Sequence, residues 1–174
     1  MVVKYRTNRR KDSHKFEIDM DVYNNALALD ARKSMEIMKN LADSLNLDKD
    51  KIGVMGFSAG GYVAQLLTYR DYNEGSADIP SFAALIYIND FLENYEKVKE
   101  MEKLPPFFLA AASNDYRLNI KETIKYLAKL AVTIPKSELH IYRDGGHGFG
   151  LGYNENGSVK DWKNSFMNWV ENLY

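Results

Sequence analysis

Hydrophobic and polar positions along the chain predict several buried strands. Continuous apolar runs at 52–57, 82–88 and 107–112 are typical of strands that are covered on both faces of a sheet. The segment 138–142 (ELHIY) indicates a further short strand, and residues 1–6 have the composition of another. The pattern therefore predicts about five strands.

Between these runs, apolar residues recur at helical spacing. An apolar stripe predicts a helix over 26–45, and further helices are expected over 58–69 and from 120 to 131. The polar stretch 7–25 is expected to be a long loop. The inner face of a last helix is formed by Trp162, Phe166, Trp169 and Leu173, with Ser158 as its N-cap. Because strands and helices alternate, we expect an α/β fold with a mainly parallel sheet and helices on both faces.

Composition narrows the classes of function. The 174 residues fit a single domain, 1–174, and the net charge of −1 gives no reason to expect nucleic acid or an anionic membrane as a partner. The basic cluster at 6–11 (RTNRRK) is interpreted as a solvated loop. With no cysteine, no apolar stretch of membrane-spanning length and no signal-peptide pattern, we expect a cytoplasmic protein, or a secreted one whose signal was removed.

A serine lies at a predicted junction between a strand and a helix. Residues 56–60 read GFSAG, which fits the pattern G-x-S-x-G around Ser58. In this setting a sharp turn lifts the hydroxyl above the sheet edge, and bulky neighbours would collide with the adjoining backbone. The alternative is a glycine-rich turn with an N-capping serine.

A nucleophilic serine needs a base, and the base needs an acid that orients it. His147 lies in a glycine-rich loop (GGHGFG) after the 138–142 strand, whereas His14 and His140 are interpreted as ordinary loop and strand residues. Asp115 follows the 107–112 strand and gives the chain order serine, aspartate, histidine; Asp90 is its competitor. No histidine–carboxylate cluster has metal-ligand spacing, so neither a metal nor a cofactor is expected.

Three segments resemble the catalytic segments of the α/β-hydrolase fold: DKDKIGVMGFSAGGYVAQLL, LPPFFLAAASNDYRLNI and ELHIYRDGGHGFGLG. They are similar to the esterase/lipase-like branch that includes acetyl-xylan esterases and other carbohydrate esterases. The resemblance implies that Ser58 is the nucleophile, Asp115 the acid and His147 the base, with the Ala59 N–H in the oxyanion hole. It also implies hydrolysis of a small-molecule or saccharide ester, with acetyl esters of sugars favoured.

The chain also departs from that family. Its members have three further strands upstream and an HGGG-like loop that gives a second oxyanion amide, and nothing here matches that loop. The fold is thus expected to be a truncated α/β-hydrolase in which MVVKYR resembles the family's fourth strand. We expect residues 2–5 to pair directly with the 52–57 strand, and the loop at 6–10 to offer a substitute oxyanion amide.

Other functions stay open at this point. A homodimer that covers the vacant sheet edge is one expectation. A non-catalytic or weakly active remnant that binds a ligand or a partner chain is a second function class. A peptidase on the same fold is a third, although the sequence has nothing that resembles the propeller domain of such enzymes.

Overall fold

The computed structural model describes residues 1–6, 20–73, 75–76, 78–88, 100–152 and 157–174. The elements in chain order are α1 (Met20–Leu41), β1 (Val54–Phe57), α2 (Ala59–Asn73), β2 (Ala83–Ile86), β3 (Phe107–Ala112), α4 (Ile120–Thr133), β4 (Glu138–Tyr142) and α5 (Trp162–Glu171), with 3-10 turns at Lys49–Lys51, Met101–Lys103 and Ser158–Asp161. None of the described helices is both long and apolar enough to cross a membrane.

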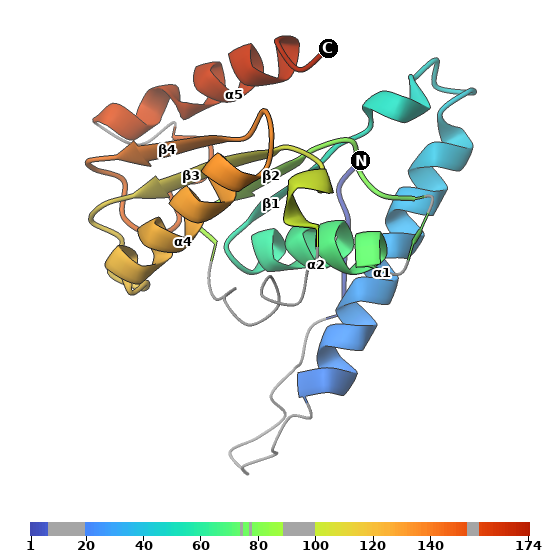
Figure 1. Ribbon diagram of the computed structural model, residues 1–174, viewed down its shortest axis with the longest axis horizontal. Coiled ribbons are helices and arrows are strands. Elements are labelled where there is room, and N and C mark those ends of the chain that lie inside the picture. The colour runs from blue at the N-terminus through green and yellow to red at the C-terminus, as the bar shows by residue number, and fades with distance from the viewer. Residues whose placement is uncertain (7–19, 74, 77, 89–99, 153–156) are drawn as a thin grey trace.

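The sheet is parallel and has the order β1-β2-β3-β4 in the described part of the chain. The expected α/β class is therefore confirmed, with four strands here where the sequence predicted about five. Consecutive strands are neighbours. Because they are all parallel, their carboxyl ends lie at the same edge of the sheet (Figure 1). Side chains that follow the strands are thereby collected along one line.

The two faces of the sheet explain the continuous apolar runs. Ala83, Leu85 and Leu109 pack with α1, α2 and α4, while Ala84 and Phe108 face the opposite way, toward α5. Among the labelled helices, Figure 1 shows α5 on one side of the sheet and α1, α2 and α4 on the other side. Since β2 and β3 are covered on both faces, alternate polar positions would be buried without partners, and the sequence there is apolar throughout.

The last helix was expected correctly but its start was not. Trp162, Trp169 and Leu173 are buried against the sheet, as the helical spacing predicted. The prediction of Ser158 as N-cap is wrong, because a 3-10 turn intervenes and α5 begins at Trp162. The Ser158 hydroxyl instead accepts a hydrogen bond from the Arg143 N–H at 3.1 Å, and so helps to hold the chain that follows β4.

Helix α1 begins earlier than its apolar stripe indicated. Residues 20–25 are helical although they were assigned to a loop, and residues 7–19 lie outside the described part of the chain. The first six residues of the helix read MDVYNN, in which periodicity shows no clear apolar stripe. Among the helix residues whose side chains are described, Leu27, Ala31 and Met35 are buried.

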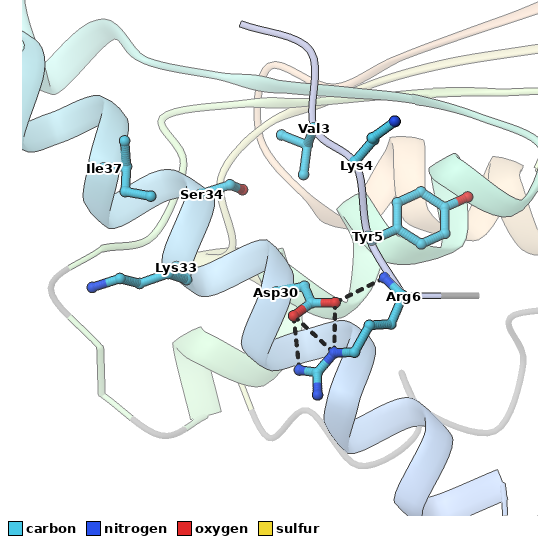
Figure 2. Close-up of a pocket in the computed structure, with 8 residues that line it drawn as sticks. All are labelled: Val3, Lys4, Tyr5, Arg6, Asp30, Lys33, Ser34 and Ile37. Atoms are coloured by element: carbon cyan, nitrogen blue, oxygen red, sulfur yellow. Dashed lines mark hydrogen bonds and ion pairs between the residues drawn. The ribbon is translucent and has the colours of Figure 1, made fainter. Parts of the chain in front are cut away.

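The N-terminal segment contradicts the expected pairing. Residues 1–6 form no strand and make no ladder with β1, so the prediction that residues 2–5 pair with the serine strand is wrong. Arg6 instead holds the segment against α1. Its guanidinium donates two hydrogen bonds to Asp30 from Nε, at 2.9 and 3.0 Å, and one from Nη2 at 2.7 Å, and its backbone N–H donates another (Figure 2). These hydrogen bonds lower the pKa of Asp30.

An open groove of about 550 Å³ lies between the N-terminal segment and α1. It is lined by Val3, Lys4, Tyr5, Arg6, Asp30, Lys33, Ser34 and Ile37 (Figure 2). Tyr5 packs into the core beside the groove. Of the loop expected to give an oxyanion amide, only Arg6 lies within the described residues, and it is engaged by Asp30.

The free edge of β1 keeps the homodimer a prediction. Within the described residues nothing pairs with that edge, and unpaired N–H and C=O groups invite a second chain. Light scattering at high concentration should give a dimer mass for the native chain and a monomer mass for Met55→Lys, because a lysine on an edge strand opposes pairing. Ile141→Lys is the matched control, since Ile141 lies on the opposite edge strand at 38% exposure against 36% for Met55. A monomer mass for the native chain would exclude the dimer.

Candidate active site

Ser58 lies in a strained turn between β1 and α2. Its φ of +49° is in the left-handed region, which is uncommon for a residue other than glycine. The backbone is held there from both sides. The Ser58 N–H donates to the Ile86 carbonyl at 3.0 Å, and the Ser58 carbonyl accepts from the Gly61 N–H at 2.9 Å. Such strain costs on the order of 1–3 kcal/mol, and it persists because the strand before it and the helix after it both impose it.

Two glycines make this turn possible. A Cβ on Gly56 would overlap the backbone of Gly60, and a Cβ on Gly61 would lie 2.6 Å from the Ile88 Cγ2. Gly60, the last glycine of the G-x-S-x-G pattern, has more room, since the nearest atom is the Tyr5 hydroxyl at 4.0 Å. The close packing expected from the motif is thus present at Gly56 and not at Gly60, while Gly61, directly after the motif, is also closely packed.

The three predicted triad residues are brought together. The Ser58 Oγ lies 2.8 Å from the His147 Nε2, and the His147 Nδ1 lies 2.8 Å from the Asp115 Oδ2. The side chain of His147 is only 9% exposed and that of Asp115 is fully buried. An ionised carboxylate only accepts hydrogen bonds, so Nδ1 carries the proton and Nε2 presents its lone pair to the serine hydroxyl. This is the arrangement in which a histidine can act as a general base toward serine.

Asp115 is fixed by the turn that follows β3. Its N–H donates to the Ala112 carbonyl at 3.1 Å, and its second carboxylate oxygen accepts from the Arg117 N–H at 2.9 Å. The carboxylate therefore has a fixed direction before it meets the imidazole. The competing residue, Asp90, lies outside the described residues.

Sequence reasoning missed the role of Asn114. The Asn114 Oδ1 accepts a hydrogen bond from the Gly146 N–H at 2.8 Å, directly before the histidine. Gly146 has a φ of +61°, which favours glycine. The turn that carries Asp115 thus also holds the loop that carries His147. An Asn-Asp pair after a strand was the available signal.

The Ala59 N–H is placed to receive developing negative charge. Ala59 is the first residue of α2, so its N–H has no acceptor within the helix, and none is recorded for it among the described residues. The helix dipole favours an anion at the same point. We propose that the Ala59 N–H is one donor of an oxyanion hole. A second backbone donor is not identified within the described residues.

The other histidines have different surroundings. His140 stacks on Phe108 with ring centroids 4.8 Å apart and pairs with Glu138 at 2.9 Å, as an ordinary strand residue would. His14 lies outside the described residues. Within the part of the chain that is described, no group of three or more histidines and acids could hold a metal ion.

A parallel sheet with a serine turn after one strand and an aspartate and a histidine after later strands defines an α/β-hydrolase. Two family models match the chain: that of the prolyl oligopeptidase family over residues 85–174, and that named BD-FAE over residues 13–104. Each match covers more than half of the chain, which therefore belongs to these α/β-hydrolase families. No curated protein matches the sequence.

Solved structures support the same fold. An acetyl ester-xyloside bifunctional hydrolase from Caldicellulosiruptor lactoaceticus is 25% identical with a TM-score of 0.70, over 85% of this chain and 66% of that one. An α/β hydrolase from a Medee basin deep-sea metagenome library is 25% identical with a TM-score of 0.69, over 84% of this chain and 64% of that one. A sugar hydrolase from Lactococcus lactis shares the fold at 18% identity and a TM-score of 0.69, over 97% and 74% of the two chains. The chain thus spans just under two thirds of the first two.

The geometry predicts which acid supports the histidine. Asp115→Asn should lower turnover of p-nitrophenyl acetate by about 10³–10⁴-fold, because an amide stabilises the wrong imidazole tautomer. Asp144→Asn is the matched control: Asp144 lies on the same loop, three residues before His147, but its carboxylate pairs with Arg143. That control and Asp90→Asn should retain most activity. A larger loss in Asp90→Asn than in Asp115→Asn would reverse the assignment.

Proposed function

We propose that this chain is a serine hydrolase that cleaves short-chain carboxylic esters through an acyl-enzyme. The observation that carries the proposal is the continuous line from Asp115 through His147 to Ser58, with 2.8 Å at each contact. A serine is a weak nucleophile unless a base takes its proton, and this line supplies both the base and the group that orients it.

The proposed steps use these residues in turn. The His147 Nε2 accepts the hydroxyl proton as the Ser58 Oγ attacks the carbonyl carbon of the ester. The Ala59 N–H donates to the oxyanion that forms, and Asp115 stabilises the imidazolium. The imidazolium then gives its proton to the leaving alcohol. Water repeats the sequence on the acyl-serine, which releases the acid and restores the free hydroxyl.

Acetyl esters of sugars are the proposed substrates. The support is the likeness to the acetyl ester-xyloside bifunctional hydrolase and one aromatic side chain. Four aromatic side chains lie a few residues from the triad in sequence: Tyr62, Tyr116, Phe149 and Tyr153. Phe149 is buried, Tyr62 is half-buried in the core and Tyr153 lies outside the described residues. Tyr116, directly after Asp115, is 78% exposed; its ring has the Arg117 guanidinium 5.8 Å from its centre and is otherwise open for a sugar ring to stack on.

Peptide hydrolysis is a second candidate, because the chain matches the prolyl oligopeptidase family model. The same triad can cleave either bond, since both reactions pass through a tetrahedral oxyanion. A non-catalytic role is the third, motivated by the open edge of β1, the strand that leads to Ser58. A fluorophosphonate probe separates the third from the other two, because only an activated serine reacts with it.

Replacement of Ser58 by alanine should abolish hydrolysis of p-nitrophenyl acetate and labelling by fluorophosphonate. The circular dichroism spectrum should be unchanged, because alanine fits the same turn. The expected loss of turnover is at least about 10³-fold. Undiminished turnover by a folded Ser58→Ala protein would exclude the assignment. A panel of acetyl esters and peptides on the native chain then separates esterase from peptidase.

A sugar-binding role for Tyr116 predicts a split between substrates. Tyr116→Ala should raise KM for acetylated xylo-oligosaccharides about tenfold, through loss of roughly 1–1.5 kcal/mol of stacking, and leave p-nitrophenyl acetate unaffected. Tyr174→Ala is the control, because Tyr174 is another exposed tyrosine whose ring contacts Lys51. Equal KM values for both variants on the oligosaccharide would remove this support for a sugar substrate.

A further inference from the structure

We propose that Tyr87 is a positioning residue that holds the imidazole of His147 between Ser58 and Asp115. The inference rests on the proposed function and extends it by one residue. The triad itself stays Ser58, His147 and Asp115. Tyr87 lies directly after β2, between the strand that carries the serine turn and the strand that carries the aspartate.

The ring of Tyr87 contacts the imidazole. Their centroids are 5.2 Å apart and the planes meet at 67°, so the rings pack edge to face. Tyr87 is itself enclosed, with only 6% of its surface exposed. Phe149 packs on it at 4.5 Å and Phe57 at 5.8 Å. The imidazole therefore packs against an enclosed ring, in addition to its contacts with Ser58 and Asp115.

The hydroxyl of Tyr87 faces the same loop at a second point. Burial raises the pKa of this hydroxyl, and the nearby backbone of Gly150, three residues after His147, opposes that rise. The Trp162 Nε1 donates to the carbonyl of Gly150 at 3.0 Å. Since Asn114 holds Gly146 on the other side, the histidine lies between two tethered points of the loop.

The backbone of Tyr87 has a strained conformation. Its φ is +38°, which is unusual for an aromatic residue. The Tyr87 N–H nevertheless donates to the Ala110 carbonyl at 2.7 Å, so the strand ladder holds the residue in this conformation. Strain of this kind persists where the surroundings impose it, and it is concentrated at functional sites.

Two substitutions separate the two contacts. Tyr87→Phe keeps the ring and removes the hydroxyl, and it should lower kcat on p-nitrophenyl acetate about three- to tenfold with KM nearly unchanged. Tyr87→Leu removes both, and it should lower kcat on the order of 10²-fold, since displacement of a catalytic group by about 1 Å has an effect of this size. Tyr142→Phe is the matched control, because Tyr142 is a half-buried tyrosine whose pKa is also raised by burial, and its ring stacks on His140, which lies outside the triad. It should keep full kcat.

A spectroscopic readout distinguishes positioning from general loosening of the fold. The proton on the His147 Nδ1, shared with Asp115, should give a downfield resonance in the proton NMR spectrum of the native chain. That resonance should broaden or shift in Tyr87→Phe and stay in place in Tyr142→Phe. If Tyr87→Leu does not fold, the Tyr87→Phe comparison still decides the matter.

The outcomes for Tyr87 and for the proposed function are separable. Native kcat and an unchanged Nδ1 resonance in Tyr87→Phe, together with native kcat in a folded Tyr87→Leu, would overturn the positioning role while leaving the esterase intact. If the native chain hydrolyses no ester and does not react with fluorophosphonate, the proposed function fails. The NMR comparison then still tests whether Tyr87 places the imidazole.

Discussion

Three hydrogen bonds between neighbouring strands, each made just beyond a strand end, determine where the site residues lie. The Ser58 N–H donates to the Ile86 carbonyl, the Tyr87 N–H to the Ala110 carbonyl, and the Ser113 N–H to the Tyr142 carbonyl. Each continues the parallel ladder one residue past the strand. Because the register is carried from β1 through β4 without a break, the serine turn, the aspartate turn and the histidine loop emerge at the same level of the sheet.

The same ladder explains why strain gathers at this edge. Ser58 and Tyr87 both follow a strand and both have positive φ, although neither is glycine. A chain that leaves a parallel strand must turn sharply to enter a helix or loop, and here it does so while the backbone is still bonded to the next strand. The strained turn therefore directs its side chain toward the histidine loop. The two side chains are the Ser58 hydroxyl and the Tyr87 ring, and both contact the imidazole of His147.

The sequence predicted the interior of the fold better than its margins. The bounds expected for β3 and β4 agree with the structure, because each segment is followed directly by residues that favour turns. The three residues predicted to form the triad were chosen from chain order, motif and the resemblance to the hydrolase fold, and they lie together in the structure although 89 positions separate Ser58 from His147. The Val-rich segment at 1–6 has strand composition, but a strand also needs a partner, and the Arg6 bonds to Asp30 place it elsewhere. That ion pair joins residues 24 positions apart without any local pattern. Tyr87 and Asn114 were missed for the same reason, since their contacts exist only once the histidine loop returns over the sheet.

The contacts that build the triad lie away from the open edge of the sheet. Asp115 and the loop around His147 are held by β2, β3 and residues next to α5, which are all enclosed in the described part of the chain. The open edge of β1 adjoins only the serine turn and the start of α2, where the Ala59 N–H is found. Whatever lies against that edge can therefore change how well an oxyanion is stabilised, an effect of about 3 kcal/mol per donor. Such a partner lies farther from the proposed base, because His147 follows β4 and Asp115 follows β3, whereas the open edge belongs to β1. The contacts proposed to activate the serine therefore lie away from the edge at which the proposed oxyanion donor is found.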